Sequence, residues 1–137
     1  MDVGQLHRIY EETRTIAVVG ASRDPAKPGN EIPAYLATQG YRVIPVSPRG
    51  GELFGEPVRA SLDDIDAPVD VVDVFRPPED AGGIAAEAAA IGAKVVWFQP
   101  GTASDEGIRI AREAGLEVVS GLCMGTTHGV LGLGPGP

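Results

Sequence analysis

The sequence is poor in cysteine and in basic residues. It contains one cysteine, and its 11 lysines and arginines are outnumbered by 19 aspartates and glutamates, for a net charge of −8. A single cysteine excludes an internal disulfide and cannot by itself build a structural zinc site. The acidic balance argues against a nucleic-acid partner, because a nonspecific hold on nucleic-acid phosphates needs a basic face.

Long apolar segments are also missing. No run approaches the roughly 18 apolar residues of a transmembrane helix, and the first residues, MDVGQLHRIYEETR, are polar and amphipathic. They do not resemble a signal peptide. We therefore expect no membrane partner and a cytoplasmic protein.

Short apolar runs alternate with helical patterns along the chain. The length of 137 residues suits one domain, with a core over about residues 10–125 and a flexible Gly/Pro tail over 132–137. The alternation predicts an α/β fold: a doubly wound, three-layer, Rossmann-like domain with a five-stranded parallel sheet of order 3-2-1-4-5 and an extra N-terminal helix. The predicted strands are residues 15–20, 41–47, 69–75, 93–99 and 116–120.

Local signals predict where several helices begin and end. Asn30 is expected to be the N-cap of the helix after the first strand, and Gly40 to follow its C-cap. Ser61 and Asp64 have the spacing of a capping box, and Thr102 is expected to cap the helix before the fifth strand.

The loop after the first strand is the expected ligand site. In open parallel sheets, ligands bind at the carboxyl ends of the strands where the strand order reverses. Backbone amides of a glycine turn and of the next helix point there, and the helix dipole adds positive potential, so a diphosphate is the expected guest. Gly20, Ser22, Gly29 and Asn30 are expected around it.

This loop lacks the dinucleotide fingerprint. A G-x-G-x-x-G pattern from Gly20 needs glycine where Ser22 and Pro25 stand, and Arg49 replaces the acid that usually contacts a ribose hydroxyl. An arginine there favours a phosphorylated ribose, either the 2′-phosphate of NADP or the 3′-phosphate of coenzyme A (CoA). The cations that follow the first three strands, and that can attract a polyanion, are Arg23, Lys27, Arg49 and Arg76.

Four segments resemble a known family. IAVVGASRDPAKPGNEI, VIPVSPRGGELFGEPV, VVDVFRPPEDA and VVWFQPGTASDEGIRIAREAGLEVVSGLCMG are similar, in this order, to the CoA-binding domain that stands alone in many small bacterial proteins. That domain is similar to the nucleotide-binding half of the succinyl-CoA synthetase α subunit. The resemblance covers about residues 10–125. The residues it implies are Gly20, Ala21, Ser22 and Arg23 around the CoA diphosphate, Val46, Ser47 and Arg49 at the adenosine part, Phe75, Arg76 and Pro77 beside the adenine, and Gln99 with Pro100 on the floor.

The expected function is therefore binding of CoA or an acyl-CoA by a non-catalytic carrier or sensor, with no metal and no catalytic residues. A protein partner or a homo-oligomer stays open. One alternative is an NADP-binding oxidoreductase or regulator. Another is an acyl-CoA thioester enzyme that uses Cys123 as nucleophile and His128 as base, the two residues that follow the fifth strand.

Overall fold

One parallel five-stranded sheet organises the molecule. The structure, a computed structural model, describes residues 1–135. The sheet order is β2-β1-β5-β6-β7, and every pair of neighbouring strands in it is parallel. This confirms the predicted doubly wound, Rossmann-like α/β class. The strands of the sheet are β1 (Thr15–Val19), β2 (Arg42–Val46), β5 (Val71–Val74), β6 (Val95–Phe98) and β7 (Glu117–Ser120).

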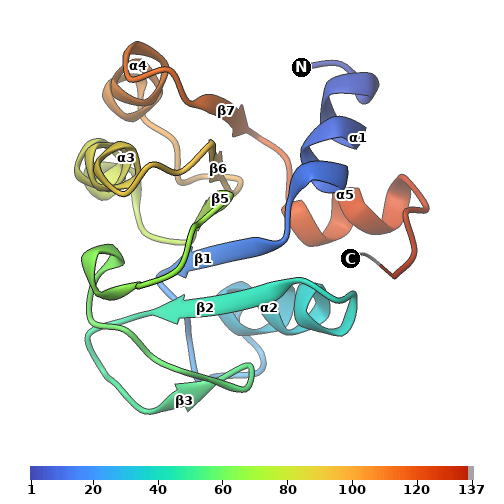
Figure 1. The fold of residues 1–137 in the computed structure, drawn as a ribbon, viewed down its shortest axis with the longest axis vertical. Coiled ribbons are helices and arrows are strands. Elements are labelled where there is room, and N and C mark those ends of the chain that lie inside the picture. The colour runs from blue at the N-terminus through green and yellow to red at the C-terminus, as the bar shows by residue number, and fades with distance from the viewer. Residues whose placement is uncertain (136–137) are drawn as a thin grey trace.

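Helices cover both faces of the sheet, as Figure 1 shows. One face carries α3 and α4, and the other carries α1, α2 and α5. A small hairpin and two 3-10 turns complete the fold. The bounds are α1 (Val3–Glu12), α2 (Pro28–Thr38), α3 (Ala81–Ala90), α4 (Asp105–Glu113), α5 (Met124–Val130), β3 (Glu52–Leu53), β4 (Glu56–Pro57), η1 (Leu62–Asp64) and η2 (Pro78–Asp80).

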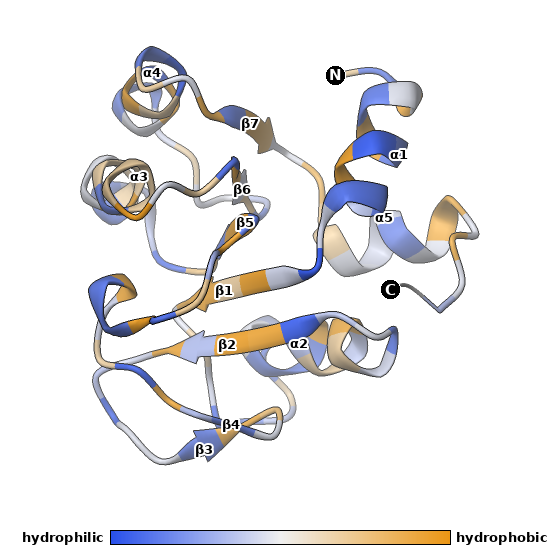
Figure 2. Ribbon diagram, in the orientation of Figure 1, coloured by the Kyte–Doolittle hydropathy of each residue, from blue (hydrophilic) through white to orange (hydrophobic). Residues whose placement is uncertain are grey.

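The core is divided into two layers by the sheet. Val71 and Trp97 belong to the apolar cluster beneath α1, α2 and α5, whereas Val72 and Phe98 belong to the cluster beneath α3 and α4. Successive residues of a strand face opposite sides, so continuous apolar runs fill both layers. Figure 2 shows apolar colouring along much of β1 and β2 and hydrophilic colouring over much of α1.

The strand order differs from the expected 3-2-1-4-5 in the place of one strand. β5 pairs with β1 and β6, so the five strands numbered along the chain run 2-1-3-4-5. The outer edge of β2 is covered instead by the returning loop, where Arg59 N donates to Pro45 O at 3.0 Å. Proline in a sheet is confined to edge strands or bulges, so Pro45 was a signal that β2 lies at the edge. The strand order therefore reverses between β1 and β5.

Two helices begin at residues other than those predicted. α2 begins at Pro28 with Lys27 as N-cap and not with Asn30. A proline at the first helical position has its φ already set and needs no partner for an amide. α4 is capped by Ser104 and not by Thr102.

The capping box predicted at Ser61 and Asp64 is also wrong. The segment is a single 3-10 turn in which the Ser61 hydroxyl donates to the Asp64 carboxylate at 3.3 Å and caps no backbone amide. The expected end of α2 is confirmed, because Gly40 follows the C-cap residue with φ of 99°.

Helix α5 was not predicted from the sequence. Its seven residues, MGTTHGV, include two glycines and have little helix propensity of their own. Packing holds it in place: Met124 and His128 are fully buried, and the Tyr10 hydroxyl donates to Met124 O at 2.6 Å. Leu133, in the predicted flexible tail, packs against the same cluster. Residues 136–137 of that tail lie outside the described residues.

Candidate functional site

A cleft of about 1260 Å³ opens at the carboxyl ends of β1, β2, β5 and β6. It lies beside the reversal between β1 and β5, where the fold class predicts a ligand. All but two of the residues predicted for the site line it, and the exceptions are Asn30 and Pro77. The predicted residues in its lining are Gly20, Ala21, Ser22, Arg23, Lys27, Gly29, Val46, Ser47, Arg49, Phe75, Arg76, Gln99 and Pro100.

The two exceptions are the neighbours in sequence of lining residues Gly29 and Arg76. Asn30 Nδ2 donates to Ser22 O at 2.7 Å and so ties α2 to the loop after β1. Pro77 precedes η2 with φ of −60°, the angle that its ring imposes. Asn30 therefore serves the shape of the loop, which its polar side chain did not reveal.

At two positions of the cleft, the backbone of a neighbouring segment lies so close that only glycine fits without strain. Gly20 has φ of 93°, and a Cβ on it would lie 3.2 Å from the backbone carbon of Phe75. A Cβ on Gly29 would lie 2.8 Å from the Gly20 carbonyl oxygen. The loop after β1 is therefore pressed between the loop after β5 and the first turn of α2.

Most amides at the front of this loop are already bonded within the protein. Gly20 N donates to Val46 O at 3.1 Å, and Ser22 N donates to Gly29 O at 3.1 Å. Among residues 1–135, the amides of Arg23 and Gly29 have no acceptor. An anion in this loop would therefore depend on these two amides and on side-chain cations, rather than on the full set of amides expected from the sequence.

The cations along one wall of the cleft are exposed. The Arg23 guanidinium donates to the carbonyl of Arg49 at 3.3 Å and to the carbonyl of Gly50, which joins the loops after β1 and β2. In the part of the chain that the structure describes, the side chains of Lys27 and Arg49 form no ion pair. These two cations therefore remain available to a ligand.

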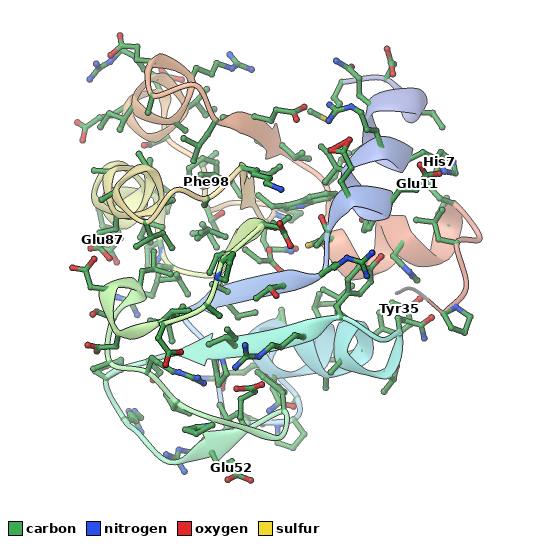
Figure 3. The ribbon with its side chains drawn as sticks, viewed as in Figure 1. His7, Glu11, Tyr35, Glu52, Glu87 and Phe98 are labelled. Atoms are coloured by element: carbon green, nitrogen blue, oxygen red, sulfur yellow. The ribbon has the colours of Figure 1, made fainter. Side chains whose placement is uncertain are left out.

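The opposite wall, formed by η2 and α3, is acidic. Glu79, Asp80 and Glu87 line it, and Figure 3 shows Glu87 projecting from α3 at the edge of the molecule. Asp80 pairs with Arg76 at 3.1 Å, so this predicted cation is partly neutralised. The positive potential is consequently concentrated on the side of β1 and β2.

A buried carboxyl that the sequence analysis did not place in the site is hydrogen-bonded to the floor residue Gln99. Asp73, in β5, is fully buried, and its Oδ1 accepts from Gln99 Nε2 at 2.6 Å. Burial raises the pKa of Asp73 to about 7, although the hydrogen bond from Gln99 acts in the opposite direction. The available signal was the second aspartate of VDVVDVF, which stands between valines in the middle of the strand, since aspartate is seldom fully buried without a specific partner.

Cys123 and His128 do not form a nucleophile and base pair. Cys123 lines the cleft, but His128 is fully buried among tyrosines, with its Nδ1 2.8 Å from the Tyr35 hydroxyl. Figure 3 shows Tyr35 beside α5, on the other side of the molecule from Glu87. Burial lowers the pKa of His128. No hydrogen bond joins the two residues within 1–135, so the catalytic pair of the alternative enzyme hypothesis is not assembled.

The described residues contain neither a cluster of metal ligands nor a long apolar helix. No group of three or more histidine, cysteine, aspartate or glutamate side chains in residues 1–135 has the arrangement of a metal site. Over the same range, every helix is too short or too polar to cross a membrane.

Comparisons with known proteins identify the family of the chain. The family model described as a CoA binding domain matches residues 14–129. An uncharacterized Bacillus subtilis (strain 168) protein, YneT, is 34% identical over 126 residues, which are 92% of this chain and 93% of that protein. The α subunit of the ADP-forming acetate–CoA ligase II of Pyrococcus furiosus is 30% identical over 128 residues, and the match covers 84% of this chain but only 28% of the subunit.

A solved structure extends this likeness to three dimensions. The Thermus thermophilus protein known as cell-free ID.343 has a TM-score of 0.92 and 43% identity, with 96% of this chain and 99% of that chain covered. The family-model match covers most of the chain, residues 14–129. The chain therefore belongs to the CoA-binding domain family.

Proposed function

We propose that this protein binds CoA or an acyl-CoA in the cleft at the carboxyl ends of β1, β2, β5 and β6, and that it works as a non-catalytic carrier or sensor. The observation that carries the proposal is that two exposed cations, Lys27 and Arg49, line a large cleft in a protein whose net charge is −8. Local positive potential of this kind attracts a polyanion that the whole molecule would repel.

The ligand's orientation follows from the distribution of these cations. The diphosphate lies against the loop after β1, near the unbonded amides of Arg23 and Gly29. The 3′-phosphate lies near Arg49, in the loop after β2. The pantetheine arm then extends in the other direction, across β5 towards β6.

A binding role is favoured over catalysis. Cys123 is a cleft residue without a base, because His128 is turned into the tyrosine cluster. The likeness to 28% of a CoA ligase subunit supports a CoA module that is separable from the rest of such an enzyme. A carrier or a sensor needs only this module.

Isothermal titration with CoA, dephospho-CoA and NADPH tests the proposal. Loss of the 3′-phosphate removes a charge-assisted contact of about 1.5 to 3 kcal/mol, so dephospho-CoA should bind roughly 10- to 100-fold more weakly than CoA. NADPH should bind more weakly than CoA. Binding of NADPH in preference to CoA, or binding of neither, contradicts the proposal.

A further inference from the structure

Asp73 is the most unusual side chain of the core. It is fully buried in a strand whose other residues are valines, and among residues 1–135 its Oδ2 has no hydrogen-bond partner. Burying a carboxyl with one unsatisfied oxygen costs free energy of folding, and burial accordingly raises the pKa of Asp73 to about 7. A fold that keeps this group in place of a fourth valine needs a reason outside core packing.

Its hydrogen-bond partner, Gln99, stands at the border between core and cleft. Gln99 lines the cleft but is only 5% exposed, and its backbone oxygen accepts from the Thr102 hydroxyl at 2.7 Å. The backbone and the buried side chain of Gln99 are both held in place. Only the orientation of its terminal amide, with either the oxygen or the nitrogen facing the cleft, is left to be determined.

Asp73 decides that orientation. Gln99 Nε2 donates to Asp73 Oδ1 at 2.6 Å, so the amide oxygen Oε1 is directed away from the carboxyl. Within residues 1–135 no donor bonds this Oε1, and it is not among the buried atoms that lack a partner. Gln99 Oε1 is therefore an acceptor that is open to the cleft.

The sheet order determines which part of a ligand meets this acceptor. Strands lie about 4.8 Å apart, so β6 is roughly 10 Å from β1, on the side opposite to β2 and Arg49. With the diphosphate at β1 and the 3′-phosphate at β2, the part of CoA that reaches β6 is the pantetheine arm, which carries two amide N–H donors.

We propose that Asp73 is a positioning residue that holds the Gln99 amide with its oxygen towards the cleft, where it accepts a hydrogen bond from an amide N–H of the pantetheine arm. This inference rests on the proposed function and deepens it. The floor of the cleft recognises the pantetheine arm, whereas the cations at its rim recognise the phosphates.

The test compares CoA with adenosine 3′,5′-bisphosphate, which lacks the pantetheine arm. Asp73→Leu removes the acceptor that orients Gln99, so it should weaken CoA binding by about three- to tenfold and leave bisphosphate binding unchanged. Asp73→Asn should restore CoA binding, because its amide oxygen still accepts from Gln99. In a Gln99→Leu background, Asp73→Leu should cause no further loss of affinity.

A structural role for Asp73 gives different results. Equal loss of both ligands in Asp73→Leu, or an additive loss in the Gln99→Leu background, overturns the inference. If Asp73→Leu does not fold by thermal melting, Gln99→Leu and Asp73→Asn are compared instead: Gln99→Leu should lose affinity for CoA only, and Asp73→Asn should not. A wild-type protein that binds neither ligand refutes the proposed function itself, whereas wild-type binding of both with no selective loss refutes only the role of Asp73.

Discussion

In the proposed complex, the rim and the floor of the cleft recognise the ligand through different kinds of interaction. At the rim, exposed cations such as Lys27 and Arg49 supply charge that solvent and salt screen. On the floor, buried Gln99 is held in one direction by its hydrogen bond to buried Asp73. In the proposed complex, the rim attracts and orients a polyanion, and the floor selects for the group attached to it. Breaking one region at a time separates the two contributions.

The largest expected effect is at the floor and concerns stability. Asp73 has an ordinary pKa of 3.8 when unfolded and about 7 when folded, so the unfolded state ionises first as the pH rises. The free energy of unfolding contributed by Asp73 therefore falls between about pH 4 and pH 7 and is level above that. Asp73→Asn cannot ionise, so this fall in unfolding free energy, on the order of 2 to 4 kcal/mol, should be absent in the variant.

Urea unfolding of Asp73→Asn and wild type at pH 4 and pH 8 measures how much of the unfolding free energy depends on ionisation of Asp73. The stability of the variant relative to wild type should be greater at pH 8 than at pH 4. A difference that is the same at both pH values would show that Asp73 does not titrate in this window.

The next effect is at the rim and concerns affinity. Arg49→Gln removes the proposed 3′-phosphate contact, so it should reduce CoA affinity by about 10- to 100-fold and leave dephospho-CoA affinity nearly unchanged. Calorimetric titration of both ligands checks this, with Arg109→Gln on α4 as the matched control, since Arg109 pairs with Glu113 outside the cleft. Parallel loss of both ligands in Arg49→Gln would place the 3′-phosphate elsewhere.

The close approach of backbone at the rim gives the third effect. Gly29→Ala places a Cβ 2.8 Å from the Gly20 carbonyl, so the variant should lose about 1 to 3 kcal/mol of unfolding free energy and bind CoA more weakly. Gly83→Ala, in α3, meets nothing within 4 Å and should gain about 0.5 to 1 kcal/mol. Thermal unfolding of the pair checks this, and equal Tm values for the two variants would contradict the tight packing of this loop.

The smallest effect lies outside the cleft, at His128. Burial keeps the folded pKa of His128 below its ordinary value of 6.5, so the unfolded state gains a proton first as the pH falls. The stability contributed by the neutral ring is thus complete above pH 6.5 and declines below it. His128→Gln should flatten this part of the stability profile relative to wild type. Identical slopes of the unfolding free energy for wild type and His128→Gln between pH 5 and 6.5 would contradict the account.

Local sequence patterns predicted the elements of the fold better than their arrangement. The β-branched runs around Val18 and Val72 are typical of strands buried on both faces, and such strands formed where they were expected. Strand order depends on long-range pairing, and Pro45 was the one local signal of it. Helix α5 left no signal of its own, because packing of Met124 and His128 stabilises it rather than propensity.

The candidate site was predictable where it depends on glycines and charges along one loop. The positions of Gly20 and Arg49 at the ends of adjacent strands were enough to locate the cleft. The pairing of Asp73 with Gln99 was not predictable, because one side-chain hydrogen bond joins two residues that are 26 positions apart in the sequence. Buried polar pairs of this kind leave little pattern in the sequence.

Backbone amide NMR of ¹⁵N-labelled protein during addition of CoA tests the central claim most directly. We predict that CoA perturbs the amides of Gly20 to Arg23, of Arg49 and of Gln99, and leaves those of α1 unchanged. Adenosine 3′,5′-bisphosphate should perturb the first two groups and not Gln99. No perturbation at saturating CoA, or perturbation confined to residues outside the cleft, would contradict the account.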